Sequence, residues 1–305
     1  MADNLLASVR YVVRDPSIPP NEKGYILHYA APPGFPQNNF KIEPHKNIKM
    51  HDLRHSPISY EENGIKIVSI NSEGMTPELF DDDTWIENVY LPELHRSLCK
   101  ALGAKDVTVF DWMLRKRAVS FPQRNVGEEN EDQAQPSLSA HIDYTTAELD
   151  SRLDQYFGAD KERIANSRYQ VINIWKPLTG PCRDFPMAYL DPLTVNPSSD
   201  LYTVDEVFPT VANEVFQVQH NPNHKWYWVP DQLDSEITIF QAVCIYTTPP
   251  LPSLPLNPHP PTPSSRAFHT NLPRTDPTAS PAPAYASAAA GEHVSFLPAA
   301  GEQIT

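Results

Sequence analysis

The chain has 305 residues, of which 40% are hydrophobic and 10% aromatic, enough to fill a substantial core. Its formal net charge of -14 at pH 7 argues against a phosphate-binding surface, because nucleic-acid-binding proteins present clustered Lys and Arg. We therefore expect a globular protein that binds neither nucleic acid nor an anionic membrane.

Cysteine usage and the N-terminal sequence point to a reducing compartment. Cys99, Cys182 and Cys244 are widely spaced and form no Cys-x-x-Cys motif, so the pattern indicates neither a disulfide framework nor a zinc-thiolate site. The N-terminus has no basic region followed by an apolar core, and no apolar run of about 18 residues occurs. We expect a cytoplasmic protein without a membrane span.

The N-terminal part of the chain reads as short strands separated by polar loops. Residues 9–13 and 25–29 alternate in the manner of strands, and Asn63-Gly64 is a turn signal that predicts a hairpin over residues 57–70. The histidines of the intervening polar segment are irregularly spaced, which is typical of surface residues.

The clearest helix signal covers residues 84–102, where apolar residues recur at steps of three and four. Acidic residues precede this segment, where they suit the positive end of the helix dipole. Gly103 follows it and can adopt the left-handed conformation that ends a helix. Residues 107–112 then read as a buried strand.

A His-x-Asp motif follows an acidic loop over residues 122–137. On a strand, side chains at i and i+2 point to the same face, so His141 and Asp143 can both reach one metal ion. Thr145 and Glu148 form a capping-box signature, which predicts a helix at about residues 146–165. The motif is therefore expected at a strand-to-helix junction.

The chemistry of this motif depends on a third ligand. Two histidines and one carboxylate on one face of an octahedron suit non-haem Fe(II), because three positions stay open for cosubstrate and dioxygen. The same donor set suits Zn(II) in a hydrolase, and an exposed turn before a helix is the simplest alternative. His220 and His224 are candidate third ligands within a predicted hairpin tip.

Short strands dominate the rest of the chain, at residues 168–175, 187–190, 214–219, 225–229 and 237–240. The segments at residues 214–219 and 225–229 are predicted to form a hairpin around residues 220–224. Such a series of short strands predicts a mainly β fold with flanking helices, built on a double-stranded β-helix, or jelly-roll, core.

The pattern divides the chain into three parts. Residues 1–80 are predicted to form an N-terminal β cap with loops, and residues 81–248 a helix plus the jelly-roll core. Residues 249–305 are rich in Pro and Ala and poor in apolar periodicity, which predicts disorder or extended coil for much of this tail.

Several blocks resemble, in the same order, the AsaB/CmcJ-like hydroxylase/desaturase family of fungal secondary metabolism, which includes gibberellin-desaturase-like proteins. The blocks span roughly residues 55–275 and are Tyr90-Leu-Pro-Glu-Leu94, Val109-Phe-Asp-Trp112, Ala140-His-Ile-Asp143, Tyr169-Gln-Val-Ile-Asn-Ile-Trp-Lys-Pro-Leu178, Asn221-Pro-Asn-His-Lys-Trp-Tyr-Trp228 and Phe268-His-Thr270. The resemblance implies an Fe(II)- and 2-oxoglutarate-dependent oxygenase on a double-stranded β-helix.

Carried over onto this chain, the family pattern implies His141, Asp143 and His269 as the iron ligands. It implies 2-oxoglutarate as cosubstrate and O2 as oxidant, in the hydroxylation or desaturation of a small secondary metabolite. His269 would come from the Pro/Ala-rich tail.

The resemblance also implies an arginine that binds the distal carboxylate of 2-oxoglutarate. No arginine follows Arg274, so Arg266, Arg274 or Lys176 would have to take this role. The missing cosubstrate arginine is the basis of an alternative hypothesis, in which the chain is a catalytically degenerate jelly-roll paralogue that binds a metabolite or a partner protein.

Three residues of the strand at 168–175 are weaker candidates for lining the cofactor pocket, namely Tyr169, Gln170 and Asn173. Asn173 stands among large apolar neighbours and needs a hydrogen-bond partner if it is buried.

Overall fold

The computed structural model describes residues 5–19, 21–116, 135–165, 169–245, 291–292 and 301–303. The strands are β1 (Leu5–Arg14), β2 (Gly24–Leu27), β3 (Phe40–Asp52), β4 (Ile65–Ser69), β5 (His141–Ile142), β6 (Tyr169–Trp175), β7 (Met187–Leu190), β8 (Leu201–Val207), β9 (Ala212–Val218), β10 (Trp226–Trp228), β11 (Glu236–Ile245), β12 (Gly291–Glu292) and β13 (Gly301–Gln303). The helices are α1 (Tyr60–Asn63), α2 (Asp83–Trp85), α3 (Leu91–Leu102), α4 (Thr146–Phe157), α5 (Lys161–Ala165) and α6 (Pro197–Asp200). Short 3-10 turns are η1 (Pro77–Asp81), η3 (Gly158–Asp160) and η4 (Pro192–Thr194), and η2 (Ile86–Tyr90) is a π turn.

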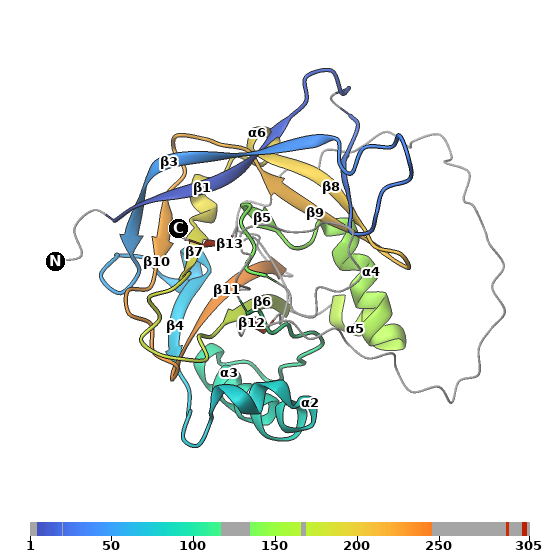
Figure 1. Ribbon diagram of the computed structural model, residues 1–305. Coiled ribbons are helices and arrows are strands. Elements are labelled where there is room, and N and C mark those ends of the chain that lie inside the picture. Colours follow the sequence, from blue (N-terminus) through green and yellow to red (C-terminus); the bar gives the residue numbers. More distant parts are fainter. Residues whose placement is uncertain are drawn as a thin grey trace.

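Within the described residues the strands form three curled sheets, with the orders β1-β3-β10-β7-β13, β12-β6-β11-β4 and β2-β8-β9-β5 (Figure 1). The first two face each other across a buried cluster. Tyr189 and Tyr227 come to it from β7 and β10, and Trp175 and Phe240 from β6 and β11. The predicted jelly-roll core is confirmed.

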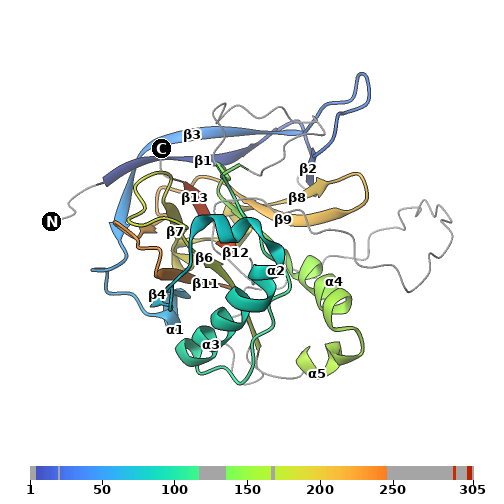
Figure 2. The ribbon, with the colours of Figure 1, turned by 60° about the horizontal axis from the view of Figure 1, so that its bottom comes forward.

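The outer face of the β6–β11 sheet is covered by α3 and the turns before it (Figure 2). Alternation along β6 sends Ile172 and Ile174 to this face, where they pack against Leu94 and Leu98 of α3. The opposite face of β6 therefore carries Asn173 toward the interior. No helix in the described ranges is both long and apolar enough to cross a bilayer.

The helix predicted over residues 84–102 is present, but a π turn interrupts it. Leu91 donates its amide to the carbonyl of Ile86, one residue wider than an α-helical bond. Pro92 follows directly and has no N–H to donate to residue 88, so a regular ladder would be broken at this point in any case. The helix ends at Gly103, which has φ 62 in the left-handed region, as predicted.

Three local predictions were wrong. Residues 57–70 form no hairpin, because Gly64 at φ 68 caps helix α1 instead of turning one strand into the next. Residues 107–112 adopt no strand, and their apolar side chains pack onto the clusters around α3 and α4. The segments β9 and β10 pair in different sheets, so residues 214–229 form no hairpin.

Two short strands of the Pro/Ala-rich tail were not expected from its composition. β12 pairs antiparallel with β6, and β13 pairs antiparallel with β7. Both add to the edges of the two sheets that enclose the core. The rest of residues 249–305 lies outside the described residues.

Candidate functional site

The His-x-Asp motif lies at the end of β5, between strand β9 and helix α4 (Figure 1). Strand β5 pairs antiparallel with β9, so that His141 stands opposite Gln217. Just before it, Ala140 donates its amide to the carbonyl of Arg10 at 2.9 Å and accepts from the amide of Val218 at 2.8 Å. The backbone leading into the motif is thus hydrogen-bonded on both sides, to β1 and to β9.

The Thr145 half of the predicted capping box fixes the other end of the motif. The reciprocal half does not form, because the Thr145 amide donates to the Glu214 carbonyl and the Glu148 carboxylate accepts from the Glu214 amide. The amide of Glu148 donates to the hydroxyl of Thr145 at 3.2 Å, which starts α4 two residues after Asp143. Thr145 in turn donates its hydroxyl to the carboxylate of Glu214 on β9. The same element that pairs with β5 therefore also binds the start of α4, which holds the short segment between them.

The two candidate ligands converge as the i, i+2 spacing predicts. His141 Nε2 lies 3.2 Å from Asp143 Oδ1, and both side chains are only about one-fifth exposed. His141 Nδ1 lies 2.6 Å from the carbonyl oxygen of Ser139. A carbonyl can only accept, so Nδ1 carries the proton and Nε2 is the nitrogen directed at Asp143. This is the orientation that metal-binding histidines receive from a backbone carbonyl.

The electrostatics of His141 favour positive charge at this point. Burial alone would lower the pKa of the imidazole, but the hydrogen bond and charge of Asp143 outweigh it, helped by the Ser139 carbonyl. The pKa of His141 therefore lies above its ordinary value of 6.5.

Asn173 supplies a partner to the carboxylate from the opposite sheet. Its Nδ2 donates to Asp143 Oδ2 at 2.6 Å, so one carboxylate oxygen is held by β6 and the other faces His141. Asn173 is 3% exposed, and its Oδ1 is buried without a hydrogen-bond partner in the described structure. We expected a buried Asn173 to need a hydrogen-bond partner. Asp143 is that partner for the Asn173 Nδ2 atom.

The donor set fits a divalent metal ion as far as the described residues extend. A histidine nitrogen with a fixed tautomer and a carboxylate with one braced oxygen are two ligands of a two-histidine, one-carboxylate site. No cluster of three His, Cys, Asp or Glu side chains able to hold a metal occurs in the described ranges. The remaining predicted ligand, His269, lies outside these residues, as do Arg266 and Arg274.

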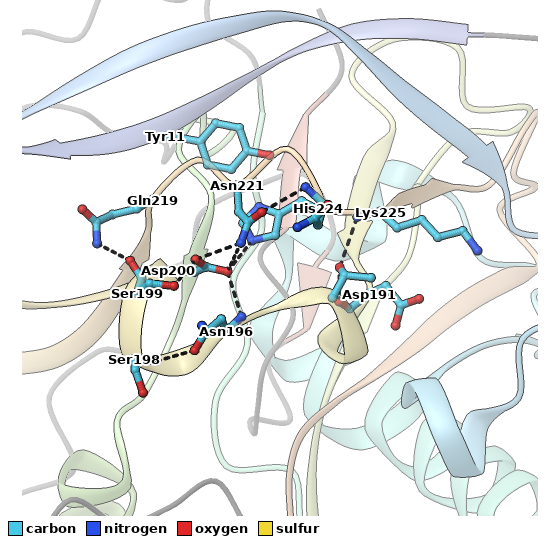
Figure 3. A network of polar contacts seen from close by, with 12 residues as sticks. Tyr11, Asp191, Asn196, Ser198, Ser199, Asp200, Gln219, Asn221, His224 and Lys225 are labelled. Atoms are coloured by element: carbon cyan, nitrogen blue, oxygen red, sulfur yellow. Dashed lines mark hydrogen bonds and ion pairs between the residues drawn. The ribbon is translucent and has the colours of Figure 1, made fainter.

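The rival third ligands belong to a separate polar network (Figure 3). His224 Nε2 lies 3.1 Å from Asp200 Oδ2, and Asn221 Nδ2 donates to the same carboxylate oxygen at 3.0 Å. The ring of Tyr11 stacks on His224, and His220 contacts Tyr11 edge to face. Both histidines thus pack around Tyr11 of β1, and the structure does not bring them to the His141–Asp143 pair.

Lys176, a candidate for the cosubstrate anchor, lies elsewhere. It is 1% exposed, and its Nζ donates to the carbonyl of Pro177 at 3.2 Å and stands 5.2 Å from the ring centroid of Phe80. Phe80 belongs to the cluster on the α3 side of the β6 sheet. Lys176 therefore lies on the opposite side of this sheet from Asn173.

Tyr169 and Gln170 lie at the far end of β6 from the pair. They line a cavity of about 740 Å³ between the segment after α3, helices α4 and α5, and β6. Tyr169 is four residues from Asn173, about 13 Å along a strand. Burial raises the pKa of the Tyr169 hydroxyl. Neither His141 nor Asp143 lines this cavity.

Two contributors to the site were missed from the sequence. The carbonyl of Ser139 orients His141, and Gln217 stands opposite His141 on β9. A backbone carbonyl has no sequence signature, so the contact between Ser139 and His141 could not be read from residue types. Gln217 comes from a strand 76 residues away, and nothing in the sequence pattern indicates that it pairs with His141.

A family model described as "Oxidoreductase/YMDC permease-like domain" matches residues 10–245. Among characterised relatives, the Fe(II)/2-oxoglutarate-dependent dioxygenase nvfI of Aspergillus novofumigatus is 27% identical over 70% of this chain and 76% of its own length. The alpha-ketoglutarate-dependent dioxygenase tstK of Talaromyces stipitatus is 27% identical over 70% of this chain and 81% of its own. The hydroxylase/desaturase efuI of Hormonema carpetanum is 24% identical over 64% of this chain and 70% of its own length.

The fold is also similar to that of a protein from this group of relatives. A solved structure of the iron and alpha-ketoglutarate-dependent endoperoxidase NvfI superposes with a TM-score of 0.63 at 26% identity, covering 78% of this chain and 83% of that one. The resemblance inferred from the sequence blocks is confirmed, because these relatives are fungal dioxygenases and hydroxylase/desaturases.

Proposed function

The chain belongs to the oxidoreductase/YMDC permease-like domain family, and on that premise we propose that it is an Fe(II)- and 2-oxoglutarate-dependent oxygenase that hydroxylates or desaturates a small secondary metabolite. One observation carries the proposal. His141 Nε2 and Asp143 Oδ1 converge to 3.2 Å at a strand end, with the other histidine nitrogen tied to a carbonyl and the other carboxylate oxygen tied to Asn173. Two ligands are thereby oriented in advance for one ion.

In this proposal the chain's own residues position the reaction centre. His141, Asp143 and His269 would hold Fe(II), and 2-oxoglutarate would serve as cosubstrate. The bound iron supplies the activation of O2 that attack on an unactivated C–H bond requires. The Ser139 carbonyl keeps the proton on His141 Nδ1 and so leaves Nε2 available as a ligand. Asn173 keeps the Asp143 carboxylate from rotating away from the histidine.

The comparisons do not favour the alternative of a degenerate binding protein. The relatives named above are enzymes, and this chain matches them across the region that carries the pair.

Metal content tests the proposal directly. Purified protein reconstituted anaerobically with Fe(II) and passed through a desalting column should retain about one ion per chain, and His141→Ala or Asp143→Ala should retain almost none. His55→Ala is the matched control, because His55 also lies beside an aspartate, Asp52, at 2.6 Å, but in an exposed turn. Equal iron content in wild type and in all three variants would overturn the assignment.

A further inference from the structure

Gln217 occupies the position beside the metal-binding histidine. In the antiparallel β5–β9 ladder it is the direct partner of His141. Directly opposed residues point to the same face of a sheet, with Cβ atoms about 4.5–5.5 Å apart. The Gln217 side chain therefore lies on the His141 side of β9, within reach of a group bound to that histidine.

The carboxamide of Gln217 is buried and incompletely bonded. Gln217 is 5% exposed, and its Oε1 is buried with no hydrogen-bond partner within the described structure. Buried polar atoms are nearly always paired, so an orphaned acceptor beside the His141–Asp143 pair points to a donor that the described residues do not supply. Asn173 Oδ1 shows the same feature from the opposite sheet.

His141 cannot be the missing donor. Its Nδ1 proton goes to the Ser139 carbonyl, and its Nε2 is directed at Asp143. A bound group next to the histidine would supply a donor for Gln217. Water molecules coordinated to a divalent ion are strong donors, because the cation polarises their O–H bonds.

We propose that Gln217 is a positioning residue of the His141–Asp143 site, whose carboxamide oxygen accepts a hydrogen bond from a water molecule coordinated to the bound divalent ion. The inference rests on the proposed metal-dependent function. Gln217 would thereby hold that water in place from strand β9. It contributes to ion affinity through that water, without itself being a ligand.

The test uses Co(II) alone as the probe, titrated calorimetrically into the metal-free full-length protein. Replacing an outer-sphere partner typically weakens metal binding 10- to 100-fold. Gln217→Met keeps the length of the side chain and removes the acceptor, so we expect Co(II) affinity to fall about 10-fold or more. Gln217→Glu restores an acceptor oxygen and should bind Co(II) at least as tightly as wild type.

Thermal unfolding of the metal-free variants separates positioning from a structural role. Removing an unpaired buried acceptor leaves no partner stranded, so the melting temperature of Gln217→Met should stay equal or rise. Gln219→Met, at the residue that follows the end of β9, is the control, because Gln219 Nε2 donates to the Ser199 carbonyl at 2.7 Å. This control should lose stability and keep its Co(II) affinity.

The possible outcomes are distinct. Unchanged Co(II) affinity in Gln217→Met, with wild type binding normally, would overturn the role of Gln217 and leave the proposed function standing. A weaker affinity accompanied by a lower melting temperature of the metal-free protein would show a structural role and would also overturn it. Failure of wild type itself to bind Co(II) would overturn both the proposed function and this inference.

Discussion

Asn173 on β6 donates its amide to Asp143 Oδ2 at 2.6 Å, which joins the strand that lines the core to the carboxylate of the His-x-Asp motif. The contact crosses between two different sheets, because β6 pairs with β11 and β5 pairs with β9. This amide therefore ties the carboxylate of the motif to the opposite sheet.

The first prediction concerns this contact. Asn173→Leu removes the amide that donates to Asp143 Oδ2 and should weaken Fe(II) or Co(II) binding about 10- to 100-fold. Equilibrium dialysis against Co(II) measures the change. Asn63→Leu is the matched control, since Asn63 is also buried and donates to an aspartate, Asp191, at 3.0 Å outside the site.

The control should lower the melting temperature without changing metal affinity. If both variants lost metal binding equally, general destabilisation would explain the result. If Asn173→Leu bound metal as tightly as wild type, Asn173 would have no part in the site.

The second prediction is a pH dependence of stability that originates in the network around His224. Burial lowers the pKa of His224 below 6.5, although the hydrogen bond and charge of Asp200 oppose the shift. The unfolded chain then takes up the proton at a higher pH than the folded chain. The free energy of unfolding therefore falls as the pH drops below about 6.5, and continues to fall until the folded histidine is also protonated.

For one histidine the slope of this fall is at most about 1.4 kcal/mol per pH unit. His224→Gln keeps a donor for Asp200 and removes the titration, so the slope between pH 7.5 and 5.5 should decrease. Urea unfolding at each pH provides the measurement. A slope identical in wild type and His224→Gln would show that other groups cause the acid sensitivity.

The strand-to-helix junction could be predicted because its signals are local. His141 and Asp143 are two residues apart. The capping signature of Thr145 and Glu148 follows directly and marks the start of α4 at Thr146. Strand β6 was predicted for the same reason, since its alternation is complete within seven residues. Each of these features is determined by side chains that are neighbours in the sequence.

The features that were missed depend on pairing at a distance. Strand β3 has few buried residues and many Lys, His and Asn, so no apolar period marks it. It is a strand because it pairs along its length with β1 and, at its end, with β10. The position of Gln217 opposite His141 likewise follows from strand register, which a single sequence does not encode in any local pattern.

The last prediction concerns the cosubstrate anchor. Lys176 lies over Phe80 on the α3 side of the β6 sheet, whereas Asn173 and Asp143 lie on the other side. Lys176→Met should therefore leave 2-oxoglutarate affinity unchanged.

Arg266 and Arg274 are the remaining candidates. A charge-assisted hydrogen bond to the distal carboxylate is worth about 1.5–3 kcal/mol, so removal of the arginine that makes it should weaken 2-oxoglutarate binding roughly 10- to 150-fold. Anaerobic calorimetric titration of 2-oxoglutarate into Fe(II)-loaded Arg266→Met, Arg274→Met and Lys176→Met would identify the residue. Weakening in Lys176→Met alone would contradict the placement of this lysine. Tight binding in all three variants would assign the anchor to a residue outside this set.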